Sequence, residues 1–195
     1  MSPGTAMHVC LAPMYVRVLA VKAMADAERE AALLQCDVEE MGVMWVPGEP
    51  VPAARTGGNG KRRFKDAKTA RYQQAVCDAA VAAALPRVGI ADDEAAIVVA
   101  HLFCSRSNAR ERAKVRAERI ADESGPDVDN VAKSLLDGMQ LHHIEKATID
   151  GLMMTGGPMR DDRRVCSMTI RRHLAGSWCG PGALVVLARV RVLDR

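Results

Sequence analysis

Three segments with the sequence pattern of a β-strand constrain the fold of this chain more than any other feature. They are "EAAIVVAHLFC" (94–104), "RRVCSMTIRRHL" (163–174) and "GALVVLARVRVL" (182–193), and the last two alternate apolar and polar residues over part of their length. Runs of this kind are typical of β-strands. The shorter run "GVMWVPG" (42–48) ends in proline and glycine and predicts one more strand. The chain must therefore build a sheet.

Helical patterns separate these runs. Asp66 suits the N-cap of a helix that continues to about Leu85 with an apolar side for the core, and a second helix begins near Asp129, between two strands. Three or four strands with three helices predict an α+β domain with a small mixed sheet flanked by helices. Residues 1–40 are alanine-rich and predict an N-terminal helical extension, which leaves 41–195 as the main domain. Met41 could be an internal start.

Composition excludes several classes of protein. The six cysteines form no C-x-x-C pair and no zinc-finger spacing, so they are predicted to be reduced thiols in a cytoplasmic protein. No uncharged apolar stretch is long enough to span a membrane, and the opening run, interrupted by Arg17 and Lys22, does not resemble a signal peptide. A chain of 195 residues can bury one real core.

Positive charge is concentrated in a few segments, although the net charge is only +3. Residues 105–119 hold six basic residues against two acids. Such clusters can neutralise phosphates, but a solvated helix face with charge pairs one turn apart would look the same. Charge alone leaves both interpretations open. The basic residues that we single out as DNA-binding candidates are Arg55, Lys61, Arg62, Arg63, Arg106, Arg110, Arg112, Lys114, Arg163 and Arg164.

The stretch "GPDVDNVAKSLLDGM" (125–139) carries the most specific chemistry. From Asp129, Lys133 and Asp137 recur every four residues, so one stripe of the helix is expected to present acid, base and acid. Val131, Leu135 and Met139 form a second stripe about 200° around the helix, which is expected to pack. Asp127 and Asp129 could simply cap the helix start.

The alternative to a cap is a metal site. Two neighbouring carboxylates can hold a hard divalent cation such as Mg²⁺, which prefers oxygen ligands. A third carboxylate would complete such a site, and "MRDDRRV" supplies Asp161 and Asp162 just before a predicted strand. Asp161 could be a supporting partner or a cap, and Asn130 is expected to support the helix start. His101, His142 and His143 are not expected to be ligands.

At these residues the chain resembles the RusA-type Holliday junction resolvases. "PDVDNVAK", "LDG" and "DDRRV" are similar to that family's motifs, and "VPGEPVP" with "KTARY" resembles the family's opening. The resemblance extends from Met44 to the C-terminus. It implies that Asp127, Asp129 and Asp162 bind Mg²⁺, with Mn²⁺ as a substitute, and that Lys133 is catalytic.

The same resemblance implies partners and a cellular role. It implies a homodimer that hydrolyses phosphodiester bonds in four-way or branched DNA, during recombination and repair, associated with the nucleoid of a bacterium or encoded by a phage. In that mechanism the metal ions polarise the phosphate and activate a water, and the lysine stabilises the developing charge.

An internal echo complicates the assignment. "NVAKSLLDGM" and "HIEKATIDGL" align with a shift of 13 residues, and the spacing from "LDG" to "DD" is longer than the family usually has. In one continuous helix this shift would rotate Lys146 by about 220° and move it roughly 20 Å from Lys133. Both lysines could not then serve one site, and we favour Lys133 because it is local to Asp127. The rival function is a branched-DNA-binding relative that cannot cut because the insertion has displaced Asp162.

Overall fold

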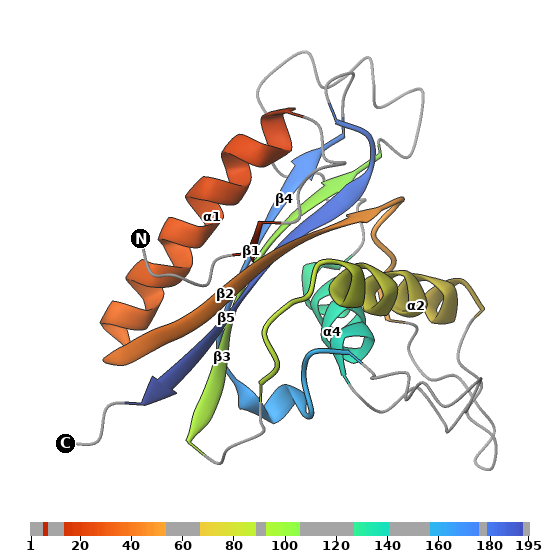
Figure 1. Cartoon of the computed structure of the whole chain (residues 1–195). Helices are drawn as coiled ribbons and strands as arrows, with labels where there is room; N and C mark the ends of the chain where they lie inside the picture. Colours follow the sequence, from red (N-terminus) through yellow and green to blue (C-terminus); the bar gives the residue numbers. More distant parts are fainter. Residues whose placement is uncertain are drawn as a thin grey trace, which may run out of the picture.

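A mixed five-stranded sheet forms the centre of the protein in the computed structural model, with α1 on one face and α2 and α4 on the other (Figure 1). The structure describes residues 6–7, 14–53, 67–88, 93–105, 127–140, 157–175 and 179–192. Its elements are β1 (Ala6–Met7), α1 (Met14–Leu33), β2 (Cys36–Pro47), α2 (Ala67–Ala82), β3 (Glu94–Cys104), α4 (Val128–Met139), the 3₁₀ turn η2 (Asp162–Arg164), β4 (Val165–Leu174) and β5 (Gly182–Val192). The predicted α+β class, with a helix near the N-terminus, is confirmed.

The strand order is β1-β2-β5-β3-β4. β5 pairs antiparallel with β2 and β3, whereas β3 and β4 are parallel, as are β1 and β2. β3 and β5 are therefore interior strands with neighbours on both sides, and this explains the long apolar stretches in both, Ile97–Ala100 in β3 and Ala183–Ala188 in β5. β4 is the last strand of the order, and it carries more polar residues.

Each face of the sheet has its own apolar core. Along β3, Val98 and Leu102 lie beneath α2 and α4, while Val99 and Phe103 lie on the α1 side. This alternation follows from the two-residue period of a strand. No helix within the described part of the chain has the length and apolar character needed to cross a membrane.

Helix α1 packs on the sheet through small residues. Its buried positions are Val16, Ala20, Ala23, Ala27 and Ala31. Polar contacts add to this packing. Asp26 of α1 forms an ion pair with Arg171 of β4, and Ser167 of β4 donates a hydrogen bond of 2.9 Å to Glu30 of α1. The helical extension is thus part of the sheet's covering layer.

The predicted helical pattern over residues 1–40 runs too far. The helix ends at Leu33, Gln35 turns the chain with a positive φ of 56°, and β2 begins at Cys36. The first residues of β2 include three acids, and their sequence does not predict a strand. They nevertheless pair with the end of β5, where Cys36 lies opposite Val192. That long-range pairing decides their structure. The division of the chain at residue 40 stays a prediction.

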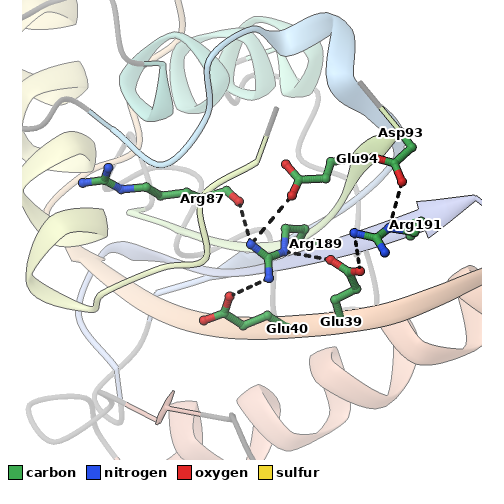
Figure 2. Close-up of polar contacts among 7 residues, drawn as sticks. All are labelled: Glu39, Glu40, Arg87, Asp93, Glu94, Arg189 and Arg191. Atoms are coloured by element: carbon green, nitrogen blue, oxygen red, sulfur yellow. Dashed lines mark hydrogen bonds and ion pairs between the residues drawn. The ribbon is translucent and has the colours of Figure 1, made fainter. Parts of the chain in front are cut away.

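An ion-pair network lies at the end of the sheet where β2 and β3 begin and β5 ends. Figure 2 shows Arg189 and Arg191 of β5 among acids from β2 and from the start of β3. Arg189 lies 3.2 Å from Glu39, 3.4 Å from Glu40 and 3.9 Å from the buried Glu94. Arg191 lies 3.0 Å from Glu39 and 2.9 Å from Asp93. The network joins the three strands β2, β5 and β3 side by side.

Candidate active site

Helix α4 packs through the stripe that its sequence predicts. Val131, Leu135 and Met139 are all fully buried. Gly138 lies so close to α2 that an added Cβ would stand 2.7 Å from the Cβ of Val76. Any larger residue would push the two helices apart, and this accounts for the glycine of the "LDG" motif.

The opposite stripe is only partly as expected. Asp129 and Lys133 are exposed, but Asp137 is half-buried and accepts a hydrogen bond of 3.0 Å from Gln73 Nε2 of α2. The expectation that Asp137 presents chemistry beside them is therefore corrected, because its carboxylate holds α4 against α2. Gln73 is 64 residues away in the chain, so no local pattern could indicate this contact.

Asp127 is the N-cap of α4, yet its side chain makes no capping hydrogen bond within the described structure. Its carboxylate is exposed, and its contact with the Asn130 side-chain amide, at 3.5 Å, is long. A capping hydrogen bond therefore does not explain why an acid stands at this position. Asp127 and Asp129 present two exposed carboxylates at the start of α4, with Lys133 one turn further along.

Three separate sequence motifs meet at the start of α4, and we call this region the motif junction. The Ala53 N–H donates to the Asn130 carbonyl at 2.8 Å, and the Thr69 hydroxyl donates to the Pro52 carbonyl at 3.3 Å. The junction thus joins the "VPGEPVP" loop after β2, the "KTARY" start of α2 and the "PDVDN" start of α4. Sequence alone could only place these motifs far apart along the chain.

The end of β3 reaches the same region. Ser105, which follows β3, donates its backbone N–H to both carboxylate oxygens of Glu49 at 3.0 Å. Tyr72, one turn after Thr69, is buried, and burial together with the charge of Glu49 raises the pKa of its phenol, which stays protonated. Ser105 is also the last described residue before the most basic segment of the sequence, residues 106–119.

Asp161 and Asp162 lie in a different place. Asp161 is the cap of η2, since it accepts a hydrogen bond of 3.0 Å from the Arg163 N–H. Asp162 and Arg163 are exposed. η2 leads directly into β4, whose first residue, Val165, pairs with Ala96 near the start of β3. Figure 1 shows η2, in blue, beside the start of β3.

The two acidic groups are therefore at opposite ends of α4. The Met159 N–H donates to the Met139 carbonyl at 2.9 Å, so Asp162, three residues later, follows the C-terminal end of this helix. The ten residue steps from Asp129 to Met139 cover about 15 Å of helix axis. Among the residues that the structure describes, no three His, Cys, Asp or Glu side chains are grouped to hold a metal ion. The donor types suit Mg²⁺, but one chain does not bring the three carboxylates together.

The remaining candidate site residues fall into two groups, those that the structure describes and those outside the described residues. Arg163 and Arg164 belong to η2, beside Asp162. Outside the described residues lie Arg55, Lys61, Arg62, Arg63, Arg106, Arg110, Arg112, Lys114, His142, His143 and Lys146.

His101 is far from a ligand role at this site. It is buried on the α1 side of the sheet, and its Nδ1 lies 2.8 Å from Nε2 of His173 on β4. Burial lowers the pKa of His101 to about 4, so its ring is neutral at physiological pH. This histidine is part of the buried face of the sheet, beside His173 of the neighbouring strand, as its apolar surroundings in the sequence predict.

A comparison with known protein families matches the part of the chain that forms the motif junction. The family model described as Endodeoxyribonuclease RusA matches residues 47–145, just over half of the chain. The matched range contains the loop after β2, α2, β3 and the whole of α4, whereas Asp162 lies beyond its end. No curated protein matches the chain. This protein belongs to the RusA endodeoxyribonuclease family.

Proposed function

We propose that this protein is a structure-specific endodeoxyribonuclease that cuts four-way and other branched DNA, requires Mg²⁺ or Mn²⁺, and acts as a homodimer in DNA recombination and repair. The family supports nuclease activity. The observation that supports the proposal is the motif junction, where the loop after β2 and the start of α2 meet the start of α4, the helix end that carries the exposed Asp127, Asp129 and Lys133.

The residues of this site suit a phosphodiester. The Lys133 ammonium is exposed one turn from Asp129, where it would contact a phosphoryl oxygen and stabilise its charge. The basic segment that begins after Ser105 would bind the flanking backbone phosphates, which carry most of the affinity for DNA. The two exposed aspartates carry only negative charge. A divalent cation held by their carboxylates would therefore supply the positive charge that stabilises a bound phosphate.

The first prediction concerns the two acids of α4. Asp127→Asn and Asp129→Asn should each lower the rate of junction cutting by about 100-fold or more, because a carboxylate is lost, while junction binding stays unchanged or tightens. Gel-shift and nicking assays on four-way, flap and linear duplex DNA measure both properties. Asp137→Asn is the matched control on the same helix, since that side chain serves Gln73, and it should keep most of the activity.

A rival function has one observation in its favour. Because Asp162 lies away from Asp127 and Asp129 in a single chain, the protein could bind branched DNA without cutting it. Tight junction binding by the wild-type protein with no cutting in either Mg²⁺ or Mn²⁺ would favour this rival. Cutting that survives Asp127→Asn would remove that residue from the site.

A further inference from the structure

Helix α1 has a second apolar stripe, on the side that faces away from the sheet. Its members are Met14, Val18 and Val21, whose exposed fractions are 83%, 63% and 61%, and the exposed Ala25. We call these four residues the outer seam. The five buried residues of α1 lie on its other side, against the sheet, and Figure 1 shows α1 as an outer layer with the sheet on one side only.

The outer seam has the spacing of a coiled-coil helix. Its residues follow one another at intervals of four, three and four, which is the alternation of the d and a positions of a heptad. Projected down the helix axis, they lie within a sector of about 60°. The next d position holds the exposed Glu28, so the seam ends after Ala25. A helix that lies on a membrane needs a broader apolar face, whereas a seam this narrow suits one further helix.

The charged residues beside the outer seam are basic. With Val18 at a and Val21 at d, Arg17 falls at a g position and Lys22 at an e position, and both are exposed. Residues 14–25 contain no acid at all. The charges at e and g decide which partner a coiled-coil helix accepts. A second copy of α1 would bring two basic flanks together, so the seam fits a helix with acidic flanks.

We propose that the outer seam of α1 binds an amphipathic helix of another protein, one whose apolar stripe is flanked by glutamate or aspartate. The apolar side chains of that helix pack on Val18 and Val21, and its acids pair with Arg17 and Lys22. The seam lies on the face of the sheet opposite the motif junction, and α1 is outside the range matched by the family model. The proposal therefore goes beyond the proposed function and does not depend on it.

Two synthetic peptides test the proposal on the full-length protein. Each peptide is about three heptads long with leucine at a and d, and the two differ only at e and g, which are all glutamate in one and all lysine in the other. Like charges keep each peptide from pairing with itself. Fluorescence anisotropy of the labelled peptides should show saturable binding of the glutamate peptide and at least about tenfold weaker binding of the lysine peptide.

Three double or single variants locate the binding. Val18→Ser with Val21→Ser should weaken binding of the glutamate peptide at least about tenfold, because two valines no longer pack on the peptide. Arg17→Glu with Lys22→Glu should invert the preference, so that this variant binds the lysine peptide more tightly. Val81→Ser is the matched control, since Val81 is an exposed valine of α2, and it should bind as the wild type does. Thermal melting checks that each variant is folded.

The other possible occupants of the outer seam have their own readouts. Equal binding of both peptides, or binding of neither, would overturn the proposal. A wild-type mass in light scattering that exceeds the mass of the double serine variant would show that a second copy of the chain covers the seam. Cosedimentation with phosphatidylglycerol vesicles that the same variant loses would assign the seam to a membrane surface. Either result would contradict an acidic helix as the occupant.

Discussion

At the scale of the residue, two aspartates at helix starts show how the same side chain can make different contacts. An aspartate at an N-cap usually accepts a hydrogen bond from the first turn, but Asp127 makes no such bond and stays exposed. Asp161 is the opposite case, because it caps η2 through the Arg163 N–H. Two acids that look alike in the sequence thus divide into a structural cap and a carboxylate directed to solvent.

The 13-residue echo gives the prediction at this scale. Lys133→Ala should lower the rate of junction cutting by about 100-fold or more, since an ammonium beside a phosphoryl oxygen contributes most in a site with little water. Lys146→Ala should change the rate little. Single-turnover kinetics with saturating protein separate this loss from weaker DNA binding. Lys133→Arg is the charge-preserving control and should recover part of the rate. A larger loss of rate in Lys146→Ala than in Lys133→Ala would instead show that the second copy of the echo supplies the catalytic lysine.

At the scale of the element, burial decides what the sequence could predict. β3 occupies Glu94–Cys104, the same residues as its apolar run, because a strand with neighbours on both sides leaves a continuous signal. The start of β2 was missed, since Cys36 and Asp37 become strand only by pairing with β5. Sequence also predicted Asp127, Asp129 and Lys133 as neighbours on α4, but the role of Asp137 and the distant place of Asp162 depend on tertiary contacts that no local pattern contains.

The ion-pair network of Figure 2 gives the prediction for an element end. The Glu94 side chain is only 8% exposed, and Arg189 is one of its partners. Arg189→Leu should lower the free energy of unfolding by about 2–4 kcal/mol, because it weakens the pairing of a buried carboxylate. Arg191→Leu should cost less than about 1 kcal/mol, because Arg191 and Asp93 are half-exposed. Urea denaturation measures both, and equal losses would show that the burial of Glu94 does not matter.

At the scale of the whole molecule, the sheet depends on cover from both sides. α2 and α4 cover the face next to the motif junction, and α1 covers the other (Figure 1). The helix before residue 40 lies outside the range matched by the family model, yet it buries residues of three central strands. An element outside the matched range thus contributes to the core that supports the site.

The last prediction follows from this dependence. A chain that starts at Met41 would lose α1, together with β1 and the first five residues of β2. This would expose one face of β3 and its neighbours, where six of the buried apolar side chains are Val43, Ile97, Val99, Phe103, Leu184 and Val186. Exposing each costs about 1.5–3 kcal/mol, and the sum is comparable to the roughly 5–15 kcal/mol that stabilises a whole domain. We expect this shortened chain to show no cooperative thermal unfolding by circular dichroism. Full-length Val18→Ser and Val21→Ser are the controls, since both side chains are exposed on the outer side of α1 and should leave the melting temperature unchanged. A shortened chain that melts cooperatively would instead establish residues 41–195 as a separate domain.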